Sequence, residues 1–211
     1  MALILNELLG FALQLAAFLL LPLVWYRATA KAWRGFWTWL GLRRPTSRSV
    51  LGALAALALV LPLQLLVLLR SPSLRQLLLD PGTPSGRLHA LGLSATAVGV
   101  LLVAAVLKTA FTEELLFRGF VAKRLIARLG FGRGNALQAL VFAAIHLPLL
   151  GLLPEASRGP GVYAFVLANP LVMGLLAGWL NERHGGGSIV PGWILHGIGN
   201  GVAYATVAFL H

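Results

Sequence analysis

Two adjacent glutamates, Glu113 and Glu114, follow a long apolar stretch, and Arg118 lies four residues after the second. The chain has only six acidic residues, and carboxylates near hydrocarbon are costly, which favours a functional interpretation of this pair. On a helix, Glu114 and Arg118 share one face and are expected to form an ion pair, whereas Glu113 is about 100° around the axis and faces elsewhere. Glu113 is therefore the candidate general base. A structural charge cluster at the membrane edge is the alternative.

Two histidines and one asparagine are the other polar groups with chemical potential in apolar segments. His146 follows Phe142 by four residues and His196 precedes Asn200 by four, so each pair shares a helix face. Together with a carboxylate they could supply a base, a second proton carrier or ligand, and donors for a developing oxyanion. Those groups suffice to hydrolyse a peptide bond without a serine or cysteine nucleophile. Taken singly, His146 is more often a satisfied core group, and the glycine-rich segment around Asn200 suits simple helix packing.

The amino-acid composition indicates whether these polar groups lie in a soluble protein or in a membrane protein. Of the 211 residues, 58% are hydrophobic and 11% are charged, which is typical of an integral membrane protein and not of a soluble domain. The net charge of +11 falls mainly between apolar segments, where it suits anionic lipid headgroups, and nucleic acid is not expected as a partner. The absence of cysteine excludes disulfides, thiolate catalysis and Cys-ligated zinc.

The expected fold is all-α, a single polytopic membrane domain over residues 1–211 with about six transmembrane helices. The apolar runs cover residues 2–26, 50–69, 88–130, 135–153, 163–180 and 189–210. The first run lacks a positive n-region and precedes a basic stretch, which favours a retained span over a cleaved signal peptide. The third run is either one long tilted helix or two helices with a break near Thr109.

The connecting segments predict the topology. Residues 27–48 mix arginines with tryptophans, which predicts an interfacial amphipathic helix on the cytoplasmic surface. The basic cluster at 118–133 predicts a second cytoplasmic turn, and both chain ends are then expected outside. The proline-containing stretch 70–87 is predicted to be a loop, as are the glycine-containing segments 155–161 and 181–187.

The three polar motifs resemble those of a known group of intramembrane proteases, the CAAX protease and bacteriocin-processing (Abi) family, which includes the type II CAAX prenyl endopeptidases. Its EExxxR motif matches residues 113–118, its FxxxH motif matches 142–146, and its HxxxN motif matches 196–200. Each motif is weak alone, but three in this order, each on an apolar segment, are specific. The resemblance covers residues 88–209, which are expected to be the catalytic core.

The resemblance implies a role for each motif residue. Glu113 would be the base that activates water with the help of His146, while His196 and Asn200 would stabilise the tetrahedral oxyanion. The supporting residues would be Glu114, Arg118 and Phe142, the first two holding the first motif in shape.

Metal dependence has two possible answers at this stage. Glu113, His146 and His196 could offer a carboxylate and two imidazoles to a divalent metal such as zinc, leaving a position open for water. However, the HExxH pattern of soluble metalloproteases is absent, and a glutamate that acts as base should not also be a tight ligand. A mechanism without a required cofactor is the preferred hypothesis.

The expected function is cleavage of a peptide or membrane-protein substrate near the cytoplasmic side of the membrane. A proton-relay translocator is one alternative, because intramembrane carboxylates and histidines also form relays. A non-catalytic immunity or scaffold protein is another. The richness in Leu, Ala, Arg and Gly suggests a prokaryotic protein and hence an inner-membrane location. The sequence leaves open whether the substrate is prenylated and how many copies of the chain assemble.

Overall fold

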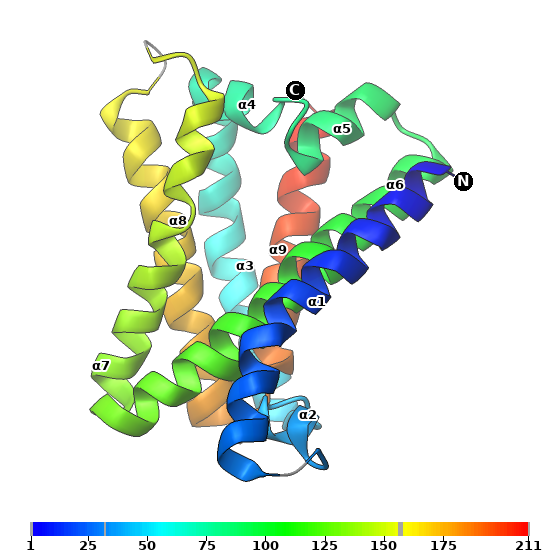
Figure 1. The fold of residues 1–211 in the computed structure, drawn as a ribbon. Coiled ribbons are helices and arrows are strands. Elements are labelled where there is room, and N and C mark those ends of the chain that lie inside the picture. The colour runs from blue at the N-terminus through cyan, green and yellow to red at the C-terminus, as the bar shows by residue number, and fades with distance from the viewer. Residues whose placement is uncertain (1, 32, 156–157, 211) are drawn as a thin grey trace.

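The computed structural model describes residues 2–31, 33–155 and 158–210, and these contain helices and turns but no strand, which confirms the all-α class. The elements in chain order are α1 (Ala2–Ala30), α2 (Phe36–Trp39), α3 (Ser47–Arg70), α4 (Pro72–Leu78), α5 (Pro84–Leu91), α6 (Ala95–Leu101), the π-helices η1 (Leu102–Phe111) and η2 (Glu114–Ala122), α7 (Lys123–Ala144), the 3₁₀-helix η3 (Leu147–Leu152), α8 (Pro160–Trp179), the π-helix η5 (Leu180–His184) and α9 (Val190–Phe209). Helix α9 packs between α3 and η1, and α7 packs along α8 (Figure 1).

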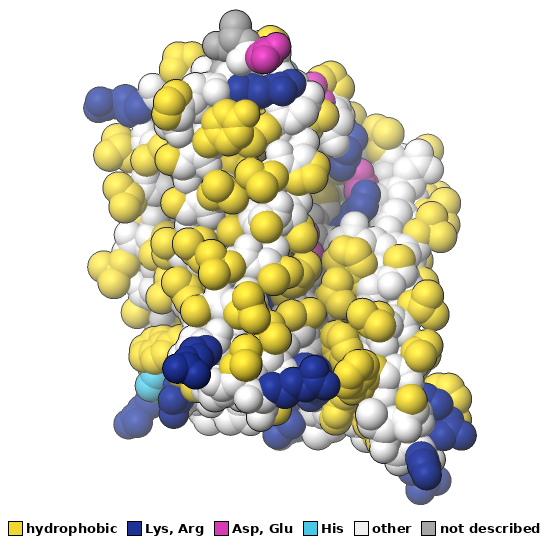
Figure 2. Space-filling model, turned by 60° about the vertical axis from the view of Figure 1, so that its left-hand side comes forward, with side chains coloured by type: hydrophobic (Ala, Val, Ile, Leu, Met, Phe, Trp, Pro, Cys, Tyr) yellow, Lys and Arg dark blue, Asp and Glu magenta, His cyan; other side chains and the backbone are white. Residues whose placement is uncertain are grey.

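Four helical segments of the described chain are long and apolar enough to cross a membrane: Ala2–Ala30, Ser47–Arg70, Ala95–Leu152 and Pro160–His184. The flank of the molecule is covered with hydrophobic side chains (Figure 2). These features are those of an integral membrane protein. The third segment has 58 residues and contains the kink of α7, and α9 is not among the four, so the count of about six spans stays a prediction.

The kink at Gly130 ends the third apolar run where the sequence predicts its end. Gly130 has φ 76° and ψ 166°, a conformation that is almost confined to glycine, and the helix turns back there. The chain is helical from Ala95 through Thr109 to the kink, so the predicted alternative of a break near Thr109 is wrong. The run is instead divided at residues 92–94, because residues 88–91 are the end of α5. Figure 1 places both chain ends at the end of the bundle away from α2, and the predicted sidedness of the two ends stays a prediction.

The basic, tryptophan-rich segment 27–48 contains much less helix than predicted. Helix α1 continues to Ala30 and α2 has only four residues, because Gly35 and Gly41 adopt left-handed φ values of 86° and 87°. Instead of lying as an amphipathic helix, the segment packs the ring of Trp39 against Phe120 of η2, at 6.0 Å between ring centroids. Residue 32 of this segment is outside the described residues.

The loop predicted over residues 70–87 is wrong, because this stretch contains α4 and the start of α5. Ser71 and Thr83 cap these helices by accepting hydrogen bonds from the backbone N–H groups three residues later, at 3.3 and 3.1 Å. A proline follows each cap at the first helical position, where its missing N–H costs nothing. These prolines start helices, although the sequence interpretation took them as loop signals.

The predicted loops nearer the C-terminus have different outcomes. The loop predicted at 181–187 is partly wrong, because η5 continues the line of α8 to His184. The loop predicted at 155–161 is present up to the start of α8 at Pro160, and its residues 156–157 are outside the described residues.

Helix α1 is tied by polar contacts to η1, to Thr112 directly after η1, and to α5. The carboxylate of Glu7 pairs with Lys108 at 3.0 Å and with Arg87 at 3.1 Å, and the Gln14 amide donates to the Thr112 hydroxyl at 2.8 Å. Polar pairs of this kind fix how one helix is positioned along another, because hydrophobic side chains alone pack almost equally well in several positions. They hold the helix that carries the two glutamates.

The Gly130 turn gives a first test of the fold. We expect Gly130→Ala to lower the free energy of unfolding by about 1–3 kcal/mol, because alanine is strained at this φ and ψ. Gly132→Ala is the matched control, since its new Cβ would meet no atom within 4 Å and its φ is not positive, and it should be neutral or stabilising by about 1 kcal/mol. Thermal unfolding in detergent, followed by circular dichroism, measures both; equal midpoints for the two variants would contradict the assignment.

Candidate active site

The Glu114 carboxylate is the most deeply buried charge of the site. Its side chain is 0% exposed, and its Oε1 lies 3.1 Å from Nη1 of Arg118, whose side chain is 2% exposed. The i,i+4 ion pair predicted from the sequence is therefore present. The Arg118 guanidinium also lies 4.0 Å from the centroid of the Phe142 ring, a cation–π contact between η2 and α7. Phe142 thus has a physical role in supporting the ion pair.

His196 connects the two glutamates. Its Nδ1 lies 3.2 Å from Oε1 of Glu114, and its Nε2 lies 3.7 Å from Oε2 of Glu113, which is close but too long for a hydrogen bond. The sequence predicted different partners for the two carboxylates. In the structure they approach one imidazole of α9 from two sides, and Arg118 is the further partner of Glu114 alone.

His146 lies just beyond the end of α7 and is held by its own helix. Its Nδ1 is 2.7 Å from the carbonyl oxygen of Phe142, which acts as the acceptor and assigns the proton to Nδ1. This leaves Nε2 with a lone pair. The Phe142 ring stands edge-on to the imidazoles of His146 and His196, at centroid distances of 4.9 and 5.8 Å. One aromatic ring therefore spaces the two histidines.

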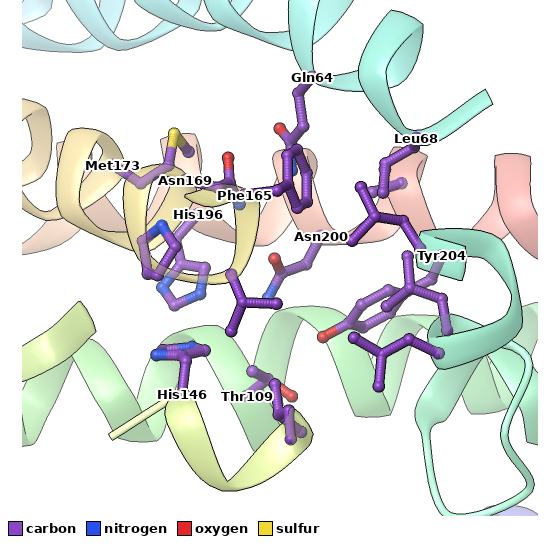
Figure 3. Close-up of a pocket in the computed structure, with 18 of the residues that line it drawn as sticks. Gln64, Leu68, Thr109, His146, Phe165, Asn169, Met173, His196, Asn200 and Tyr204 are labelled. Carbon is purple, nitrogen blue, oxygen red and sulfur yellow. The ribbon is translucent and has the colours of Figure 1, made fainter. Parts of the chain in front are cut away.

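A pocket of about 900 Å³, including its open mouth, collects the remaining predicted residues. His146, His196 and Asn200 all line it, and Figure 3 shows Asn200 and the two histidines around one space. Glu113 lies behind His196, where its Oε2 is shielded from solvent and makes no hydrogen bond within the described chain. The structure thus gathers all four predicted catalytic residues in one region.

Two residues of the site were missed by the sequence interpretation. Asn181 of η5 accepts a hydrogen bond from the Gly192 backbone N–H at 2.8 Å, while its Nδ2 has no partner within the described part of the chain. A Cβ on Gly192 would lie 2.5 Å from Oε2 of Glu114 and 2.8 Å from Nδ2 of Asn181. Gly192 therefore lets α9 approach the buried carboxylate. Asn181 fell in a predicted loop, and its amide at the end of an apolar run was the available signal.

The residues proposed as metal ligands do not fit a metal site in this structure. Among the described residues there is no group of three His, Cys, Asp or Glu side chains arranged to hold a metal ion. Nε2 of His146 keeps its lone pair, but both nitrogens of His196 face glutamate oxygens, so the two imidazoles are not both available as ligands. No catalytic step is therefore assigned to a metal.

The structure is an apolar helical bundle with carboxylates, imidazoles and a guanidinium beside one pocket. These features place the chain in the class of membrane-embedded proteins with an internal polar site. The family model described as "Type II CAAX prenyl endopeptidase Rce1-like" matches residues 87–202, more than half of the chain and all three motifs. The chain belongs to this family, which confirms the resemblance and implies an intramembrane protease. No curated protein and no solved structure shows significant similarity to the chain.

The close approach at Gly192 can be tested by adding one methyl group. We expect Gly192→Ala to lower the free energy of unfolding by about 1–3 kcal/mol, because its Cβ would displace Glu114 or Asn181. Gly201→Ala on the same helix is the control, because its nearest neighbour would be the Cβ of Ala105 at 4.0 Å. Thermal unfolding in detergent compares the two, and a Gly192→Ala protein as stable as the control would refute this packing.

The buried ion pair predicts a characteristic non-additivity. Arg118→Leu leaves the Glu114 carboxylate buried without its cation, and we expect a loss of about 3–5 kcal/mol of stability. Adding Glu114→Leu removes the stranded charge and should recover a large part of that loss. The same unfolding assay measures the cycle; simple addition of the two single losses would be the contrary result.

Proposed function

We propose that this chain is an intramembrane endopeptidase in which Glu113 activates water for direct attack on a peptide carbonyl. The observation that carries the proposal is the meeting of Glu113, Glu114 and His196, with His196, His146 and Asn200 lining one pocket in an apolar bundle. Hydrolysis without a covalent intermediate needs a base, a means of orienting water, and donors to the oxyanion, and these residues can supply all three.

In the proposed mechanism a water molecule is held between the Glu113 carboxylate and Nε2 of His146. Glu113 takes one proton as the water oxygen adds to the carbonyl carbon. The developing oxyanion accepts hydrogen bonds from the Asn200 amide and from an N–H at Nε2 of His196, the nitrogen that is not hydrogen-bonded to a glutamate. The proton on Glu113 then passes to the leaving nitrogen as the C–N bond breaks, so that one water yields a carboxylic acid and an amine. Glu114 and Arg118 keep His196 oriented.

The substrate is proposed to be a peptide or a membrane protein that enters from the lipid phase, and membrane lipids are the surroundings. Location in a prokaryotic inner membrane and cleavage near the cytoplasmic side remain proposals. The pocket walls include Leu74 and Leu77 of α4, which lies at the end of the bundle away from α2 (Figure 1). If the α2 end is cytoplasmic, the pocket extends toward the opposite side, and the cut would fall deeper in the bilayer than the sequence predicts.

A proton relay is the second candidate function, because one specific feature suits it. Glu113, His196 and Glu114 are three neighbouring titratable groups, with 3.7 Å between the first two side chains and 3.2 Å between the last two. Proton flux into liposomes containing the purified protein, without cleavage of any peptide, would favour this function over proteolysis.

The decisive test of the protease proposal replaces the base. Glu113→Gln should abolish cleavage of a peptide library in detergent while the thermal midpoint stays unchanged, because the amide is isosteric but cannot accept the proton. Asn200→Ala should reduce kcat by roughly 10²–10³-fold through loss of one oxyanion donor. Glu155→Gln, an exposed glutamate outside the pocket, is the control and should cleave normally.

The same assay separates the metal-free mechanism from its rival. A chelator should leave cleavage by the purified protein unchanged, and elemental analysis should find no stoichiometric divalent metal. Turnover by Glu113→Gln at the rate of the original protein would refute the mechanism, whereas loss of activity on chelation that zinc restores would transfer the role of activating water to a metal.

A further inference from the structure

The pocket extends well beyond the catalytic groups, and its far wall comes from helices outside the family match. Leu68 of α3 and Leu74, Leu77 and Leu78 of α4 line it, and all of them precede the matched residues 87–202. No Lys, Arg, Asp or Glu is among the lining residues. A ligand segment that fills this space must therefore be uncharged.

Two carboxamides interrupt this apolar wall. Gln64 of α3 is 9% exposed and Asn169 of α8 is half-buried, and both line the pocket. Figure 3 shows the Gln64 side chain reaching into the pocket from α3, with Asn169 on the opposing helix. Neither amide forms a hydrogen bond with any described residue.

Two other amides of the bundle, on α7, donate hydrogen bonds within the protein. The Gln138 amide, which is fully buried, donates to Asn135 at 2.9 Å and to the Gly174 carbonyl at 2.8 Å. Asn135 in turn donates to the Leu175 carbonyl at 3.1 Å. The carboxamides of Gln64 and Asn169, by contrast, line the pocket without a partner in the described chain, so they are available to a ligand that enters it.

The chemistry of a carboxamide identifies the ligand group. A peptide in an apolar pocket must find partners for each backbone N–H and C=O, and leucine walls offer none. A Gln or Asn side chain presents both a donor and an acceptor, which matches one peptide unit. We propose that Gln64 and Asn169 bind the backbone of the substrate beside the scissile bond, and that the substrate is an uncharged, apolar segment in extended conformation. This inference rests on the proposed protease function.

The first test measures binding without catalysis. The probe is a fluorescent hexapeptide of leucine, alanine and valine, acetylated and amidated at its ends, titrated onto the Glu113→Gln protein in detergent micelles. Adding Gln64→Leu, which keeps the size but removes the amide, should weaken binding about ten-fold, as expected when one buried peptide group loses its partner. Asn169→Leu should act similarly. Gln76→Leu, an exposed glutamine of α4 outside the pocket, is the matched control and should leave binding unchanged.

The second test distinguishes a backbone contact from a general structural effect. Each amide of the probe is replaced in turn by an ester, which removes one N–H. In the Gln64-containing protein one position should cost several-fold in affinity, and that cost should vanish in Gln64→Leu, because the partner is already absent. A packing defect would instead weaken every probe equally.

Several outcomes would overturn the inference. They are failure of the neutral probe to bind, unchanged affinity in both leucine variants, ester costs that persist in Gln64→Leu, and equal binding of a probe with an aspartate at each inner position in turn. If the original protein cleaves no peptide but these binding effects are observed, the protease proposal is refuted and the binding site for an apolar peptide stands. The two failures are therefore distinguishable.

Discussion

The buried Glu114–Arg118 ion pair is the constraint on which the rest of the site depends. Charges removed from water need nearby partners, and here the carboxylate has Arg118 and His196 while the guanidinium also stacks on Phe142. These partners come from η2, α7 and α9. The contacts of one buried pair therefore join three helices, and they bring together the histidines that line the pocket.

Close helix approach makes this arrangement possible. A Cβ at Gly119 would lie 2.7 Å from the Leu40 carbonyl oxygen, and one at Gly174 would lie 3.1 Å from Ala139 and 3.3 Å from Arg118. Between helices in a membrane, small residues supply the contact that hydrophobic burial supplies in water. The π-helix η1 ends two residues before Glu113, and η2 begins at Glu114; such widened turns are frequent at functional sites.

The parts of the chain that precede the family match have distinct physical tasks. Helix α1 fixes η1 through Glu7 and Gln14, and α3 with α4 closes the pocket with leucines and one open carboxamide. The part of the chain that matches the family thus carries the three motifs, while the preceding helices shape the space beside them.

The sequence by itself determined the all-α membrane class, the family, and the motif residues, because hydropathy and i,i+4 spacing are local properties of the chain. It also predicted the Glu114–Arg118 pair. The tertiary structure decided the rest: that both glutamates meet His196, that Asn181 and Gly192 border Glu114, that the stretch after α3 is helical, and that residues 27–48 fold onto Phe120. Contacts between residues far apart in the chain leave no periodic signal in the sequence. A serine or threonine followed by proline occurs both at the start of a helix and in a loop, so the sequence does not distinguish the two.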